Sequence, residues 1–248
     1  MSDISRALRD LASDSIRQLR GAVAAFKDVC YANSLGAESM VLTDLIWTYA
    51  PEIEIFTIDT GRLHPETYEL MERLQRRYGR ALQVYYPDAE AVENWVASHG
   101  INGFLGSIEQ RRTCCGTRKI QPFRRAIRGR RAWVTGIRRD QSADRALAMP
   151  LEWDRDYGLY KVSPLLAWRD QDVWRYIRSR QLPYNPLHDA GFPSIGCAPC
   201  SRAVQPGDDA RSGRWWWERA DSRECGLHAR RAIFAEALAG DASAGMIE

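Results

Sequence analysis

The sequence predicts an α/β protein whose parallel sheet is covered by helices on both faces. Short apolar runs alternate with longer segments in which apolar residues recur at helical spacing, and this alternation is typical of parallel strands joined by crossover helices. The chain has 248 residues, of which 45% are hydrophobic and 27% are charged. This length and balance suit a large folded core and exclude intrinsic disorder, collagen-like repeats and coiled coils.

The predicted elements follow one another along the first 180 residues. Strands are expected where apolar runs end in polar or glycine-containing turns, and helices where apolar residues recur every three to four positions. In chain order they are strand 29–32, helix 40–49, strand 53–58, helix 65–78, strand 82–86, helix 89–98, helix 111–127, strand 132–137, a hairpin-like stretch at 151–162 and helix 170–180. Residues 1–26 also show helical spacing.

The composition of the chain changes after Leu182. Prolines and glycines then recur at short intervals, and beyond Ser201 the chain is polar, with three consecutive tryptophans at 215–217. This punctuation predicts a long loop followed by a tail without hydrophobic periodicity of its own. We therefore expect an α/β domain over residues 1–200 and a flexible C-terminal tail over 201–248. The tryptophans are expected to pack the tail onto the core or to stack on a base.

No segment has the composition of a membrane span or of a secretory signal. The longest run without Asp, Glu, Lys or Arg, residues 94–108, is broken by polar residues and glycines, and the N-terminal segment alternates charged with apolar residues. We therefore expect a cytoplasmic protein without a membrane partner. Because the cytosol is reducing, the six cysteines indicate metal binding or catalysis in preference to disulfides.

Two segments predict an anion site. Residues 34–39 follow the first strand, and in a parallel sheet ligands bind outside the carboxyl ends of the strands, where helix N-termini attract phosphate or sulfate. An ordinary turn, in which Gly36 supplies backbone freedom, is the alternative. Neither a Walker lysine pattern nor GxGxxG is present, which argues against the common nucleotide-binding folds. Residues 111–139 contain eleven basic and no acidic side chains, which indicates an anion site, a nucleic-acid face or a solvated surface. Lys119, four residues after Cys115, is expected on the same helix face as that thiol.

Four cysteines in two close pairs predict a metal site. Cys114 and Cys115 are adjacent, whereas Cys197 and Cys200 form a CxxC in a glycine- and proline-rich loop. Neighbouring side chains on a helix diverge by about 100°, which makes it difficult for the adjacent pair to bind one tetrahedral zinc ion. We therefore favour a [4Fe-4S] cluster, with separate irons for the four thiolates, over zinc. Four buried thiols packed as small hydrophobic side chains are the alternative.

Cys225 is the candidate nucleophile. It lies in the polar segment 224–228, where core packing does not explain a cysteine. His228 and nearby arginines would lower the pKa of this thiol and favour the reactive thiolate. An exposed thiol without a role is the alternative. Cys30, in a predicted strand, is expected to belong to the core.

Together these motifs resemble the thioredoxin-dependent assimilatory sulfonucleotide reductases, and most closely the iron–sulfur branch of that family, the adenylyl-sulfate (APS) reductases. The resemblance extends over residues 34–228. Besides the two cysteine pairs, it is carried by ECGLH at 224–228, TIDTGR at 57–62 and TGIRRDQS at 135–142.

The resemblance implies the fold of the ATP pyrophosphatases, which is also called adenine nucleotide alpha hydrolase-like. Residues 34–39 would then form a modified phosphate loop. The pyrophosphatases usually carry lysine where this chain has Ala37, which argues against cleavage of ATP between its α- and β-phosphates. Many of the reductases carry aspartate at the position of Ser39.

The resemblance also implies a reaction and a role for each candidate residue. Cys225 would attack the sulfur of APS, expel AMP and become an S-sulfocysteine, from which thioredoxin or glutaredoxin would release sulfite, in sulfate assimilation and cysteine biosynthesis. The four paired cysteines would hold a [4Fe-4S] cluster that assists electrostatically without a change of oxidation state. The implied substrate-binding residues are Ser34, Gly36 and Glu38 in the loop, Arg145 at the nucleotide phosphate, and Lys119, Arg211, Arg214 and His228 at the sulfate end.

Three other functions agree with parts of the sequence. A 3′-phosphoadenylyl-sulfate (PAPS) reductase belongs to the cluster-free branch, and the cysteine pairs argue against it. An iron–sulfur tRNA-modifying enzyme of the same fold would use the basic stretch as an RNA face, but the absent loop lysine and the ECGLH segment argue against it. A redox sensor would use the cluster as its switch and release no sulfite. We expect no nucleic-acid partner, and the sequence leaves the oligomeric state open.

Overall fold

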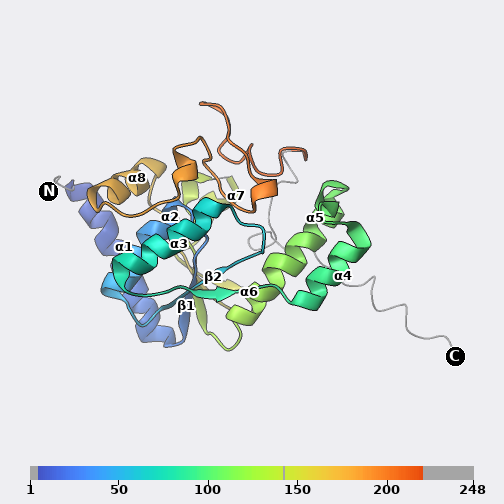
Figure 1. Ribbon diagram of the computed structural model, residues 1–248. Coiled ribbons are helices and arrows are strands. Elements are labelled where there is room, and N and C mark those ends of the chain that lie inside the picture. The colour runs from blue at the N-terminus through green and yellow to red at the C-terminus, as the bar shows by residue number, and fades with distance from the viewer. Residues whose placement is uncertain (1–4, 142, 220–248) are drawn as a thin grey trace.

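The computed structural model describes residues 5–141 and 143–219. These residues form a six-stranded sheet in the order β3-β2-β1-β4-β6-β5 (Figure 1). The strands are β1 (Val29–Ala32), β2 (Glu54–Ile58), β3 (Gln83–Tyr85), β4 (Ala132–Val134), β5 (Leu151–Asp154) and β6 (Leu159–Val162). Five strands run parallel, and β5 pairs with β6 in the opposite direction at the edge of the sheet, as the predicted hairpin requires.

Helices account for much of the remaining chain. They are α1 (Arg6–Phe26), α2 (Ala37–Tyr49), α3 (Pro65–Tyr78), α4 (Ala89–His99), α5 (Ile108–Cys115), α6 (Gln121–Ala126), α7 (Ala143–Ala146) and α8 (Asp170–Ser179). Figure 1 shows α4 and α5 at one end of the molecule and α1 and α8 at the other. Within the described residues, no helix combines the length and the apolar character that crossing a membrane requires.

The alternation of side chains along the strands divides the core into two layers. On one face, Tyr31 and Ile55 pack in a cluster with residues of α1, α2, α3 and α8. On the other face, Cys30 and Trp133 pack with Phe123 of α6. The predicted α/β sheet with helices on both faces is therefore confirmed. Cys30 is fully buried, and its assignment to the core is also confirmed.

The order of the strands reverses at β1. β2 and β3 lie on one side of β1, whereas β4 and β6 lie on the other. In open α/β sheets, ligands bind outside the carboxyl ends of the strands at such a reversal, because the loops leave it in opposite directions. The loop that follows β1 and the segment that follows β4 therefore meet at this edge of the sheet.

The helix predicted over residues 111–127 is instead a succession of three helical segments. α5 is followed by a π-helical turn, Gly116–Ile120, and then by α6. At the end of the wide turn, the Gln121 N–H donates to the Gly116 carbonyl, five residues back. Pro122 follows and has no N–H to donate to the carbonyl four residues back. The apolar spacing of the sequence does not distinguish this wide turn from an α-helical one.

A buried carboxylate connects three helical regions of the core. Asp44 on α2 is 1% exposed and accepts hydrogen bonds from the Tyr78 and Tyr176 hydroxyls, both at 2.8 Å, and from Arg180 Nε at 3.3 Å. Burial, followed by the charge of Asp44, raises the pKa of both phenols. The two tyrosines therefore remain protonated hydrogen-bond donors at neutral and mildly alkaline pH.

We expect the Asp44→Ala substitution to destabilise the fold strongly. It leaves two phenols and a guanidinium without their common acceptor, which costs about 3–5 kcal/mol and lowers the Tm by about 10 °C for a chain of this length. Thermal unfolding followed by circular dichroism measures the effect. Glu72→Gln is the control, since it removes an ion pair with Arg76 in which both side chains are at least 70% exposed. A change in Tm as small for Asp44→Ala as for the control would contradict this assignment.

Candidate functional site

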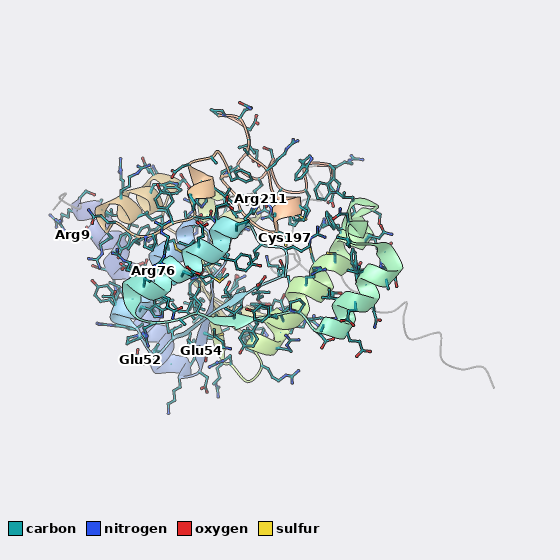
Figure 2. The ribbon with its side chains drawn as sticks, in the orientation of Figure 1. Arg9, Glu52, Glu54, Arg76, Cys197 and Arg211 are labelled. Carbon is teal, nitrogen blue, oxygen red and sulfur yellow. The ribbon has the colours of Figure 1, made fainter. Side chains whose placement is uncertain are left out.

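A cleft of about 940 Å³ opens at the carboxyl ends of the strands, between the loop after β1 and the segment after β4. The predicted site residues that line it are Ser34, Gly36, Glu38, Cys114, Cys115, Lys119, Arg145, Cys197, Cys200, Arg211 and Arg214. Figure 2 shows two of them, Cys197 and Arg211, on adjoining segments above the sheet. The structure therefore brings together all predicted site residues that it describes. Cys225 and His228 lie outside the described residues.

The loop after β1 is shaped by hydrogen bonds to its own backbone. Leu35 adopts a left-handed conformation (φ 60°), and its N–H donates to the Asn33 side-chain oxygen at 2.7 Å. The Ser39 hydroxyl accepts from the Ser34 N–H at 3.1 Å, so the residue that replaces the aspartate of many reductases supports the loop. Gly36 is the N-cap residue of α2 and provides no side-chain hydrogen bond to the helix. The positive end of its dipole is thus available to an anion in the cleft.

Glu38 connects this loop with the segment after β4. Its carboxylate accepts a hydrogen bond from Gln141 Nε2 at 2.8 Å and forms an ion pair with Arg138 Nε at 3.2 Å. The Arg145 guanidinium donates to the side-chain oxygen of the same glutamine. A Cβ atom at Gly136 would lie 3.3 Å from the Glu38 Cβ, a tight contact that the glycine avoids. Glu38 and Arg145 are therefore oriented by one shared amide.

The four predicted ligand cysteines belong to one packed group at the other end of the cleft. The Cys197 sulfur lies 3.1 Å from the Thr60 hydroxyl. The Ala198 N–H donates to the Arg62 carbonyl at 2.8 Å, which fastens the CxxC segment to the loop after β2. All four thiols are free of disulfides. The buried side chains that share the group are Trp95, Phe104 and Trp215.

The surroundings of the two buried thiols, Cys114 and Cys200, disfavour the thiolate form. Burial raises the pKa of Cys200, and the neighbouring Cys197 and Cys115 raise it further. Burial also raises the pKa of Cys114, against the opposing charge of Arg118. As the side chains lie, no three or more His, Cys, Asp or Glu of the described residues are arranged to hold a metal ion. An iron–sulfur cluster is instead supported by chemistry: four cysteines lie in one group, and four thiolates are the usual ligands of such clusters.

Guanidinium groups lie beside the cysteines. Arg118 donates to a backbone carbonyl of the loop after β2 at 2.9 Å. Arg214 Nε donates to the Cys200 carbonyl at 3.1 Å, and the same guanidinium lies over the Trp215 ring, 4.6 Å from its centroid. A Cβ atom at Gly196 would lie 2.3 Å from the Arg214 guanidinium, so this glycine provides the space for it. The cysteine end of the cleft is therefore positively charged, as an anion site requires.

The sequence alone assigns no individual function to some residues that line the cleft. Thr60 and Arg138 lie in two of the segments that carry the family resemblance, and their positions shortly after β2 and β4 are the signal that indicates the cleft. Arg111 belongs to the basic stretch, for which a solvated face is one interpretation. That interpretation is wrong for Arg111, which is 1% exposed and paired with Glu218. The partner is 107 residues away, and no local pattern reveals it.

Comparison with known proteins agrees with this geometry. Residues 28–203 match the family model described as phosphoadenosine phosphosulfate reductase domain. The chain belongs to this family. The adenosine 5′-phosphosulfate reductase of Allochromatium vinosum is 50% identical over 202 residues, which are 82% of this chain and 79% of that protein. The enzyme of the same name from Burkholderia cepacia is 48% identical over 200 residues, 81% of this chain and 80% of that protein. The chain is thus an enzyme of the reductase family.

Solved structures show the same architecture. A phosphoadenylyl-sulfate reductase from Candida auris, solved as a phosphate complex, has a TM-score of 0.66 at 26% identity. The matched region covers 82% of this chain and 98% of that protein's chain. An FMN adenylyltransferase from Candida glabrata, solved with ATP, has a TM-score of 0.56 at 15% identity, over 97% of this chain and 82% of its own. The second likeness concerns the fold alone. The adenine nucleotide alpha hydrolase-like fold that the sequence predicts is confirmed.

The raised pKa of Cys200 predicts an unusual pH dependence of its alkylation. In metal-free protein, the rate of reaction with iodoacetamide is expected to rise about tenfold per pH unit from pH 8 to beyond pH 10, whereas a free cysteine levels off above about pH 9. The reason is that only the thiolate reacts and burial keeps Cys200 protonated. Mass spectrometry of the Cys200 peptide measures the rate. Cys30, whose pKa burial raises to about 12, is an internal control for intact folding. A plateau for Cys200 below pH 9 would contradict the prediction.

Proposed function

We propose that this enzyme reduces adenylyl sulfate to sulfite and AMP, with thioredoxin or glutaredoxin as electron donor, in sulfate assimilation and cysteine biosynthesis. One observation carries the proposal. A phosphate-type loop, four grouped thiols and the cationic residues Lys119, Arg145, Arg211 and Arg214 line the same cleft in a chain that is 50% identical to an adenosine 5′-phosphosulfate reductase. Such a cleft is suited to a ligand with two anionic groups, one at each end.

The nucleotide phosphate is assigned to the loop after β1 and to Arg145. The loop contributes Ser34 and Gly36 at the uncapped start of α2, while Glu38 orients Arg145 through Gln141. The sulfate end of the substrate is assigned to the cysteine side of the cleft, where Lys119, Arg211, Arg214 and His228 would offset its charge. These cations matter because a thiolate that approaches the anionic sulfate group of adenylyl sulfate is repelled by it.

The four cysteines Cys114, Cys115, Cys197 and Cys200 are proposed to hold a [4Fe-4S] cluster. Their grouping, the absence of disulfides among them and the adjacent guanidinium groups support this assignment. When bound, the cluster would supply a fixed charge distribution beside the sulfate end, without a change of oxidation state. Thr60 and Arg111 stabilise the ligand sulfur atoms through their contacts with Cys197 and Cys115.

Cys225 is the proposed nucleophile. Its thiolate attacks the sulfur of the sulfate group, an S–S bond forms, and the bond from sulfur to the bridging phosphate oxygen breaks with release of AMP. A thioredoxin thiolate then attacks the Cys225 sulfur, and sulfite leaves with the bonding electron pair. The second thioredoxin thiol resolves the mixed disulfide, so that the dithiol is oxidised by two electrons while the sulfate sulfur is reduced by two.

Incubation with adenylyl sulfate in the absence of reductant is expected to yield a sulfonate adduct on Cys225, because the second half of the reaction cannot proceed. Mass spectrometry of the intact protein and of its peptides identifies the adduct. Cys225→Ser is expected to form no adduct and to release no sulfite, whereas Cys30→Ser, which changes a buried core thiol, retains both activities. An adduct that forms faster with PAPS than with adenylyl sulfate would overturn the substrate assignment, and an adduct on another cysteine would overturn the nucleophile.

Anaerobic purification is expected to give about four iron and four acid-labile sulfide per chain, as a [4Fe-4S] cluster requires. Cys200→Ser is expected to reduce the iron content to less than a quarter, because one of four thiolate ligands is lost. Colorimetric iron and sulfide analysis and the visible absorption spectrum measure both quantities. Stoichiometric zinc in the wild-type protein would refute the cluster.

A further inference from the structure

A buried ion pair links α5 to the last described segment of the chain. Arg111 Nε and Nη2 each donate to a different oxygen of Glu218, both at 2.8 Å. The two side chains are 1% and 3% exposed. This geometry is the two-pronged guanidinium–carboxylate contact, which is both strong and directional. Breaking such a buried pair is costly, because the remaining charge is left without compensation.

The pair lies at the junction between the cysteine group and the C-terminal segment. The Arg111 guanidinium lies over the Trp215 ring, 4.7 Å from its centroid. The backbone N–H of Trp215 donates to the Cys200 carbonyl at 3.3 Å, and the backbone N–H of Glu218 donates to the Trp215 carbonyl at 2.8 Å. Arg111 also interacts with the Cys115 thiol, one helical turn further along α5. One guanidinium thus contacts a carboxylate, a buried indole and a candidate cluster ligand.

We propose that Arg111 and Glu218 form an anchor that fixes the base of the C-terminal segment to the cysteine group and so positions Cys225 for its reaction. This inference rests on the proposed function. Arg111 and Glu218 are positioning residues, since neither has to touch the substrate. Arg211 and Arg214, which line the cleft, belong to the same anchored segment.

The length of chain beyond the anchor determines how far the nucleophile can travel. Cys225 is seven positions after Glu218 in the sequence, so their Cα atoms lie at most about 25 Å apart. If the anchor and the segment before it were released, the preceding attachment would be the bond from the Val204 N–H to the Gly191 carbonyl. The tether would then be threefold longer. Because effective concentration falls roughly as the −3/2 power of tether length, the concentration of Cys225 at the cleft would fall about fivefold.

Limited trypsin digestion of the cluster-loaded protein tests the anchor without measuring activity. The bond after Arg214 is flanked by the buried residues Gly213 and Trp215 and is expected to resist cleavage in the wild-type protein. Glu218→Gln and Arg111→Met are each expected to accelerate cleavage at this bond at least tenfold. The double variant is expected to be cleaved no faster than the faster single variant, because it contains no unpaired buried charge. Glu218→Asp, which keeps the charge but shortens the side chain, serves if a neutral variant fails to fold.

The same variants test whether the anchor positions the nucleophile. At saturating adenylyl sulfate, Glu218→Gln is expected to form the Cys225 adduct about fivefold more slowly, with unchanged iron content. Glu72→Gln, which removes the exposed pair with Arg76, is the matched control and is expected to alter neither cleavage nor adduct formation. Unchanged cleavage after Arg214 would overturn the anchor, and accelerated cleavage with a normal adduct rate would overturn its role in positioning Cys225. Either result would leave the proposed function standing. Absence of an adduct in the wild-type protein would instead overturn the proposed function, and with it the positioning role.

Discussion

Four neighbouring cysteine thiols in one cleft, two of them buried and two partly buried, impose the electrostatic constraint on which the rest of the site depends. Burial disfavours the thiolate form that a metal cluster requires, and each ionised sulfur repels the others. The protein offsets both effects with arginines, which remain charged at every pH at which it is folded. The contacts are those of Cys114 with Arg118, Cys115 with Arg111 and Cys200 with Arg214. Part of the basic stretch 111–139 therefore serves the interior of a cleft.

The sheet explains why residues from distant parts of the chain meet there. Its strands end at the same edge, so the loops after β1, β2 and β4 converge although they are separated by long helices. The loop after β2 holds the CxxC segment through Thr60 and the Arg62 carbonyl. The adjacent cysteine pair lies at the end of α5, which is followed by the π-helical turn and then by α6. Such wide turns are frequent at functional sites.

The sequence predicts those features that depend on local pattern. The period of the apolar residues predicts helix 65–78 and the alternation of strands and helices, and the spacing of the cysteines predicts their grouping. It does not predict the wide turn after Cys115, which ends with the hydrogen bond from the Gln121 N–H to the Gly116 carbonyl and is followed by Pro122. It also does not predict the burial of Arg111, because its partner Glu218 is distant in the chain and both resemble surface residues. The periodicity of apolar residues shows which face of a helix or strand is buried. It does not show which side chains of distant segments pair with each other, because tertiary packing decides that.

The distribution of positive charge distinguishes this cleft from the active site of an enzyme that cleaves a nucleoside triphosphate. The loop 34–39 contains no lysine or arginine, and Ala37 in it is buried. Such a loop binds an anion through backbone N–H groups and the helix dipole, but it adds little to stabilise charge that develops on a departing pyrophosphate. The guanidinium groups of Arg118 and Arg214 are concentrated beside the cysteines. In the proposed reaction this is the place where one anion must approach another, so the positive charge lies where the repulsion is greatest.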